Sequence, residues 1–288
     1  MVAGMALFGT ATPLSKIIGE AYPVFSASFA RMAIASAVLA PFVWFATNRF
    51  AQATRNDFLV MAAIAAAGMV GFTAAMLFGM RLTTGVIGST IMSATPAVTA
   101  AAAVFFLGAV MNARKAFALV LAMAGIAAIN LFRKDDDGGS AVLLGAGLVF
   151  LAICFEAAYT LLSRKLSSGL SSPAATLGAS LMAAPLFVVL ALIFDPAPFD
   201  FSGGGPRSMS ALLFWGAATG GLAPVLWYNG VRAAPPALSA GCMAIMPVTA
   251  LVLSYVLLGE AFEWAHALGF GLVFSGLMLM IREHANGD

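Results

Sequence analysis

Charged residues are scarce in this sequence: only 9% of its 288 residues are Asp, Glu, Lys or Arg, whereas 62% are hydrophobic. Typical soluble domains carry about 25% charged and about 45–50% apolar residues. With so few polar groups, a water-soluble fold would leave large apolar areas facing solvent. The composition therefore predicts a chain embedded in a lipid bilayer. The 14 basic and 12 acidic residues nearly balance, which gives no reason to expect a nucleic-acid partner.

Residues that bind metals or catalyse reactions are also few. Cys154 and Cys242 lie inside apolar runs without CxxC spacing, so we expect both to be packing residues. His266 and His284 flank the last apolar run with no third ligand nearby, and no metal or other cofactor is expected. The sequence has no GxxxxGK[ST] loop, which excludes ATP as the energy source within this chain. It also lacks GxSxG, HExxH and paired intramembrane aspartates, so a membrane-embedded enzyme is a distant alternative.

Long apolar runs are what the sequence has in abundance. A helix needs about 20 mostly apolar residues to cross the hydrocarbon core, and helices suit this pattern because no alternation typical of a membrane barrel occurs. We therefore predict an all-α integral membrane protein with ten transmembrane helices. The first run lacks the basic segment and cleavage site of a signal peptide, so it is expected to be a retained span. The predicted spans are residues 2–18, 24–47, 57–80, 84–108, 114–132, 141–166, 173–194, 209–231, 236–259 and 264–282.

The placement of Lys and Arg predicts the orientation of these spans. If the N-terminus is cytoplasmic, eight basic residues fall in inside loops and the tail and four in outside loops, while Lys16 and Arg31 lie within spans. Cytoplasmic loops are normally the richer in Lys and Arg. We expect a multi-pass protein of the inner (plasma) membrane with both termini in the cytoplasm.

An internal repeat organises the ten predicted helices. Several residues of the third to fifth predicted spans recur, as the same amino acid, 151 positions further along the chain. The pairs are Gly79 and Gly230, Arg81 and Arg232, Pro96 and Pro247, Leu107-Gly108 and Leu258-Gly259, and Gly125 and Gly276. This predicts two five-helix units, residues 1–135 and 141–284, and an odd helix number makes the second unit enter the membrane inverted. Inverted repeats are typical of secondary transporters with a midplane site, whereas no charge ring or filter-like loop favours a channel.

Several short motifs, in order along the whole chain, are similar to a known family. They include Phe8-Gly9 through Lys16 in the first half and Pro247-Val248-Thr249 to Leu258-Gly259-Glu260 in the second. The chain resembles the EamA-type branch of the drug/metabolite transporter superfamily. The resemblance implies a ten-helix exporter or exchanger, closest in style to the amino-acid exporters, including those of aromatic amino acids. Multidrug and nucleotide-sugar-type carriers of the superfamily are the alternatives. Ala109 departs from the pattern, because the family usually has an acidic residue there.

Ionisable side chains inside a span cost several kcal/mol, so they are candidates for function. Glu156 lies near the middle of the sixth predicted span, and Tyr159 follows three residues later on roughly the same helix face. Glu156 is predicted either to bind a substrate ammonium or coupling proton in a central cavity, or to form an ion pair with Lys16 or Arg31. Lys16 is a weaker cavity candidate because it lies near a helix end and can snorkel, and a structural role is favoured for Arg31.

Other candidates for the cavity come from aromatic and small polar residues. Trp227, Tyr228 and Asn229 lie near the inner end of the eighth predicted span, where an interfacial aromatic belt is the alternative. Ser93 belongs, with Gly88, Ser89 and Thr95, to a group of small residues that permits close helix approach. The expected partners are a small-molecule substrate and membrane lipid, and the protein is expected to be a monomer, with a dimer as the alternative.

Prolines within spans are the candidate hinges. Pro96 and Pro247 occupy equivalent positions of the repeat, and Pro13 lies in the first predicted span. Proline interrupts helical hydrogen bonding and bends a helix. We therefore predict matched bends in the fourth and ninth spans, which would either serve as gates or only shape the bundle.

Overall fold

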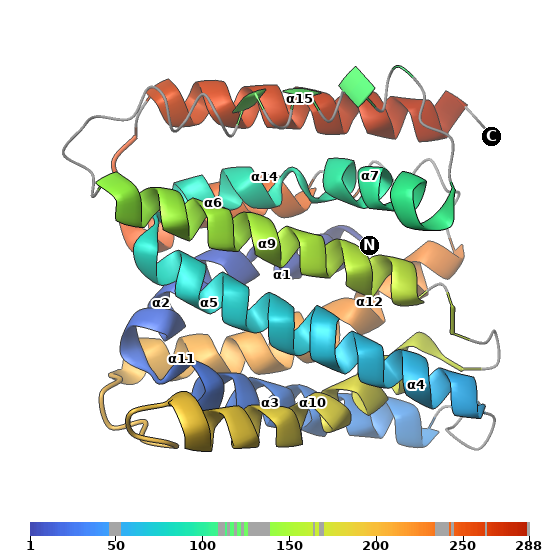
Figure 1. Ribbon diagram of the computed structural model, residues 1–288, viewed down its shortest axis with the longest axis vertical. Coiled ribbons are helices and arrows are strands. Elements are labelled where there is room, and N and C mark those ends of the chain that lie inside the picture. Colours follow the sequence, from blue (N-terminus) through green and yellow to red (C-terminus); the bar gives the residue numbers. More distant parts are fainter. Residues whose placement is uncertain are drawn as a thin grey trace.

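The computed structural model of the protein describes residues 1–45, 53–108, 139–163, 165–166, 170–233, 242, 245–262 and 264–286, with scattered positions between 113 and 125. All regular structure in these residues is helical, and no strand occurs among them. Figure 1 shows the helices stacked side by side, with α15 at one edge of the bundle and the pair α3 and α10 at the other. The expectation of an all-α membrane protein is confirmed at this level.

The described helices follow the predicted spans closely. In the first half they are α1 (Val2–Gly9), α2 (Ala11–Ala21), α3 (Val24–Phe45), α4 (Arg55–Ala63), the π-helical η2 (Ile64–Gly71), α5 (Phe72–Leu82), α6 (Gly85–Met92) and α7 (Thr95–Leu107). In the second half they are α9 (Gly139–Ser163), α10 (Ser172–Phe194), α11 (Pro206–Phe214), the π-helical η3 (Trp215–Leu222), α12 (Ala223–Ala233), α14 (Ile245–Leu258) and α15 (Trp264–Asn286).

Six helical stretches among the described residues are long and apolar enough to cross a membrane, and the pair α6 and α7 makes a seventh if it is one bent span. The six are Val2–Ala21, Val24–Trp44, Arg55–Leu82, Ser140–Ser163, Pro173–Phe194 and Pro206–Trp227. Most of the predicted fifth span and the first part of the ninth lie outside the described residues. The total of ten spans is therefore neither confirmed nor contradicted.

Helix bounds recur along the chain at a fixed interval. The series α4, η2 and α5 covers residues 55–82, and the series α11, η3 and α12 covers residues 206–233, with the same three lengths displaced by 151 residues. A π-helical stretch widens the turn in the middle of each series. The helices α7 and α14 also end alike, because each is followed by a glycine in the left-handed conformation, Gly108 with φ 64° and Gly259 with φ 67°.

Close backbone approach at glycine joins the second half to the first. The helices α5 and α9 meet at Gly79 and Gly145: a Cβ atom on Gly145 would lie 2.8 Å from the Gly79 carbonyl oxygen, and one on Gly79 would lie 3.0 Å from the Gly145 carbonyl oxygen. A second contact area, beside α3 and α10, buries Tyr22, Phe187 and Trp215 almost completely. Apolar packing between helices of the two halves therefore positions the polar groups described below.

Candidate functional site

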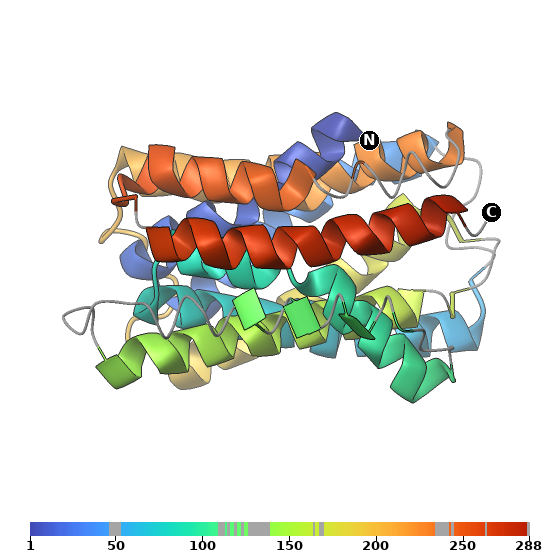
Figure 2. The ribbon, with the colours of Figure 1, turned by 90° about the horizontal axis from the view of Figure 1, so that it is seen from above.

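The helical pair α6 and α7 is interrupted near its middle. The two helices meet at a bend of 40°, and in Figure 2 α7, in green, slants across the bundle while its neighbours run nearly level. At the break, Ser93 Oγ donates to the Thr90 carbonyl at 2.5 Å and Thr95 Oγ1 donates to the Met92 carbonyl at 2.7 Å. Pro96 stands in the first turn of α7, where its missing N–H leaves no hydrogen bond unmade.

This break agrees with the predicted bend in the fourth span, although its cause is local. The chain turns at Ser93 and Ala94, and Pro96 starts the new helix rather than kinking a continuous one. Pro247 is buried in the first turn of α14, but the residues before Ile245 lie largely outside the described part. The matching bend in the ninth span remains a prediction.

Glu156 of α9 faces this break. Its Oε2 lies 3.1 Å from Thr95 Oγ1, the same hydroxyl that lies 2.7 Å from the Met92 carbonyl. A hydroxyl carries one proton and can donate to only one of these acceptors at a time. When Thr95 donates to Met92, the carboxylate needs another partner, and a proton or a substrate ammonium has the required charge. The Glu156 side chain is intermediate in exposure.

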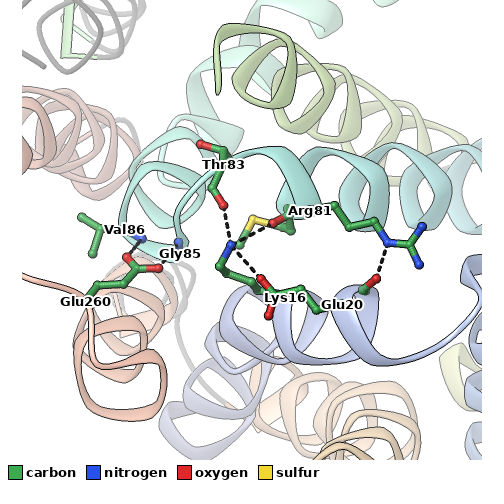
Figure 3. Close-up of polar contacts among 9 residues, drawn as sticks. Lys16, Glu20, Arg81, Thr83, Gly85, Val86 and Glu260 are labelled. Atoms are coloured by element: carbon green, nitrogen blue, oxygen red, sulfur yellow. Dashed lines mark hydrogen bonds and ion pairs between the residues drawn. The ribbon is translucent and has the colours of Figure 1, made fainter. Parts of the chain in front are cut away.

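The predicted ion-pair partners of Glu156 bind elsewhere. Lys16 pairs with Glu20 at 3.1 Å, and its Nζ donates to the carbonyls of Thr83 at 2.8 Å and Met80 at 3.3 Å. Figure 3 shows the ammonium of Lys16 turned towards Thr83 at the end of α5. Cations are favoured at the carbonyl end of a helix. The structure therefore gives Lys16 a role in joining α2 to α5.

Arg31 lies buried between α3, α5 and η3. Its Nη2 donates to Thr73 Oγ1 at 2.7 Å, and its guanidinium carbon lies 4.4 Å from the centre of the Trp215 ring. The Nε atom has no partner among the described residues, and no carboxylate there pairs with this guanidinium. Arg31 thus makes a cation–π contact and a hydrogen bond, and its structural role remains a prediction.

Tyr159 shares a helix with Glu156 but contacts a different neighbour. A Cβ atom on Gly68 of η2 would lie 2.8 Å from Tyr159 Cβ, so the tyrosine packs against the π-helical stretch. Glu156, in contrast, points at the break between α6 and α7. The two side chains thus each contact a different element, η2 for Tyr159 and the start of α7 for Glu156.

The remaining predicted site residues are spread over several elements. Trp227 is partly buried where α12 meets α1, because a Cβ atom on Gly4 would lie 3.0 Å from the Trp227 backbone nitrogen. Asn229 is exposed, and the side chain of Tyr228 lies outside the described part. Pro13 is buried within α2. Among the described residues, no group of three His, Cys, Asp or Glu side chains could hold a metal ion.

Two polar residues gain importance from the structure. Thr95, which in the sequence stood out only as a small residue, supplies the hydroxyl at the break. Glu260 accepts from the backbone N–H groups of Gly85 at 2.5 Å and Val86 at 2.7 Å (Figure 3). Its carboxylate thus caps the N-terminus of α6 from the segment after α14. The Ser-Ala-Thr-Pro order at residues 93–96 is a sequence signal that could have identified Thr95.

These features define a multi-pass helical membrane protein with a broken span and a polar site at the break. The sequence matches the EamA-like transporter family over residues 1–131 and again over residues 143–282, and the chain belongs to this family. It is 31% identical over 289 residues to the "Uncharacterized transporter YetK" of Bacillus subtilis (strain 168), an alignment that covers 100% of this chain and 87% of that protein.

The fold also has a solved counterpart. A structure titled "Crystal structure of protein" superposes with a TM-score of 0.68, covers 100% of this chain and 97% of the other, and shares 16% sequence identity. At that identity the likeness concerns the fold alone. The family and the relative indicate a membrane transporter rather than an enzyme.

Proposed function

We propose that this protein is a secondary transporter that exports small metabolites, with amino acids, including aromatic or other apolar ones, as the first class to test. The observation that carries this proposal is Glu156 facing the broken span, where one Thr95 hydroxyl lies within reach of two acceptors. Broken helices near the midplane form the substrate and ion sites of many secondary transporters.

The chemistry of the site suits a cationic group. At the break the hydroxyls of Ser93 and Thr95 donate to carbonyl oxygens, so that the carboxylate of Glu156 is the principal charge there. An amino acid would place its ammonium against this carboxylate in a charge-assisted hydrogen bond. A coupling proton would occupy the same oxygen, which allows proton and substrate to exchange at one residue.

Alternating access between two five-helix units, residues 1–135 and 141–284, is the mechanism we propose. The displacement of helix bounds by 151 residues supports it, as do the two successive matches to the same family. In such a repeat, each unit can adopt the conformation of the other, and the site then opens to opposite faces in turn. We further propose that the protein lies in the inner membrane with both termini in the cytoplasm.

Counterflow in proteoliposomes tests this function. Vesicles that contain the purified protein are loaded with one unlabelled compound at high concentration, and the uptake of the labelled compound is followed. We expect saturable, transient accumulation for one or more amino acids. Counterflow with cationic drugs or nucleotide sugars alone would assign the protein to another substrate class of the superfamily. Conductance far above carrier turnover, without counterflow, would contradict alternating access.

Glu156→Gln tests the site itself. The amide keeps the size of the side chain but removes its charge, so we expect initial counterflow rates to fall on the order of tenfold or more, since a charge-assisted hydrogen bond is lost. The pH dependence of the remaining transport should disappear. Glu20→Gln is the control, because the Glu20 side chain is 57% exposed and pairs within its own helix. Unchanged rate and pH profile in Glu156→Gln would remove this residue from the site.

A further inference from the structure

The N-terminus of α6 is held by groups from α14 and the segment that follows it. Glu260 accepts from Gly85 N–H and Val86 N–H, and one turn further along α6, Ser89 Oγ lies 3.0 Å from Ser254 Oγ. A Cβ atom on Gly85 would lie 3.0 Å from Glu260 Oε1 and 2.9 Å from Ser254 Oγ. The contact is thus tight as well as polar, and a carboxylate at a helix N-terminus also gains from the helix dipole.

Other polar contacts join elements at the same end of the bundle. Lys16 and Arg81 tie α2 to α5 beside this cap (Figure 3). Arg81 donates to the carbonyls of Gly19 and Tyr22. Asp195, just after α10, accepts from the N–H and hydroxyl of Ser26 at 2.8 and 2.7 Å near the start of α3. These contacts join α2, α3, α5, α6 and the segments after α10 and α14 at the end that the basic residues predict to be the outer one.

The polar groups of the α6 cap have no equivalents in the other half of the sequence. At the offset of 151, Glu260 corresponds to Ala109 and Ser254 to Ala103, while Ser89 corresponds to Ala240. Gly85 corresponds to Pro236, which has no backbone N–H to donate. The helices at the two equivalent positions, α7 and α14, are both followed by a left-handed glycine, Gly108 and Gly259. After this common turn, one half supplies a carboxylate and the other a methyl group.

We propose that Glu260 is a one-sided gate latch: its carboxylate holds α6 against the end of α14 whenever the face that carries Asp200 is closed, and the opposite face has no such latch. The inference rests on the alternating access proposed above. Two related conformations of nearly equal energy would be populated alike, and a contact made in only one of them shifts the population towards it. The latch therefore biases the resting protein towards closure of this face.

The test measures access to α6 from each face. In a background with Cys154→Ala and Cys242→Ala, Ser89→Cys places a thiol behind the latch, at a position that is fully buried here. Right-side-out and inside-out membrane vesicles are treated with a small, membrane-impermeant cationic thiosulfonate, and labelling rates are compared. Asp200→Cys, on the exposed loop after α10, identifies the vesicle type in which this face is open to the reagent.

Glu260→Gln is expected to raise the labelling rate of Ser89→Cys from the Asp200 face by roughly tenfold, because one N–H of α6 then meets an amide N–H in place of a carboxylate oxygen. Glu20→Gln, which removes a carboxylate at the same end, should leave the rate unchanged. Glu260→Asp keeps the charge but is too short to reach both N–H groups and should give an intermediate rate. If Glu260→Gln does not accumulate in the membrane, the labelling rate of Glu260→Asp is compared with that of the parent instead.

A labelling rate in Glu260→Gln equal to that of the parent would overturn the latch. Equal acceleration from both faces would also overturn it, since that result indicates general loosening of the fold. The assay needs no substrate, so it separates this inference from the proposed function. If no compound shows counterflow while labelling changes from one face only, the cargo assignment fails and the latch stands.

Discussion

At the scale of single residues, partners decide what each intramembrane charge does. Lys16, Arg31 and Glu156 were all predicted to lie within spans, and hydropathy could not rank them. The structure gives Lys16 backbone carbonyls and Glu20, and it gives Arg31 an aromatic ring and a hydroxyl. Among the described residues, it gives Glu156 a hydroxyl that is shared with a carbonyl. We therefore propose that Glu156, the anion among the three, is the one that binds a cationic transported group.

Arg31 allows a prediction about stability. Thr73→Val removes the acceptor of its Nη2 hydrogen bond. Leaving a buried donor unpaired costs about 1–3 kcal/mol, and more when the donor is charged. We expect a lower thermal unfolding midpoint in detergent. Arg31→Met keeps much of the side-chain volume and removes the charge, so its midpoint should be no lower than that of the parent.

The double variant completes this cycle. With Arg31→Met in place, Thr73→Val should have almost no further effect, because no donor is left unpaired. Equal losses from Thr73→Val in both backgrounds would show that Thr73 stabilises the fold without Arg31. A strong fall in transport in Arg31→Met with unchanged stability would instead assign the guanidinium to substrate binding.

At the scale of helices, glycine determines which faces can meet. Gly145 and Gly147 stand two residues apart on α9, yet Gly145 abuts the Gly79 carbonyl of α5 while a Cβ atom on Gly147 would find no atom within 4 Å. The sequence showed both as glycines in one apolar run. Only the pairing of α5 with α9 distinguishes an interhelical contact from an open surface.

Leucine substitutions at these two glycines form a matched pair of variants. Gly145→Leu should force α9 away from α5, and overpacking of this kind typically costs about 1–3 kcal/mol. Gly147→Leu adds the same side chain on the same helix without a neighbour, and it should be neutral or slightly stabilising since leucine favours helix more than glycine. Thermal midpoints by fluorescence-detected size exclusion compare the two. Similar midpoints for both would mean that the contact between α5 and α9 is looser than described.

At the scale of the whole molecule, the loop after α10 and the start of α4 mark opposite ends of the bundle (Figure 1). With both native cysteines replaced, Asp200→Cys and Asn56→Cys place single thiols at exposed positions of these ends. From the predicted orientation we expect an impermeant maleimide to label Asp200→Cys in intact cells and Asn56→Cys only after permeabilisation. The reverse pattern would invert the topology, and labelling of both in intact cells would contradict a membrane-spanning arrangement of α3 to α5.

Much of the fold was predictable from the sequence because hydropathy is local. The predicted spans 24–47, 57–80 and 173–194 agree within a few residues with α3, with the series α4 to α5, and with α10. The first predicted span is less uniform, since it divides at Thr10 into α1 and α2. The site was only partly predictable: Glu156 was selected by its charge, whereas its neighbour Thr95 was regarded as a small packing residue.

The sequence by itself determined that the chain lies in a bilayer, where its spans begin, and that helix bounds would recur, because each depends on composition or order along one chain. Only the tertiary structure decided which polar groups meet. Thr95 and Glu156 are 61 residues apart, and Gly85 and Glu260 are 175 apart. Such pairs form because packed helices bring distant segments within hydrogen-bonding distance, and no local pattern encodes which segments those are.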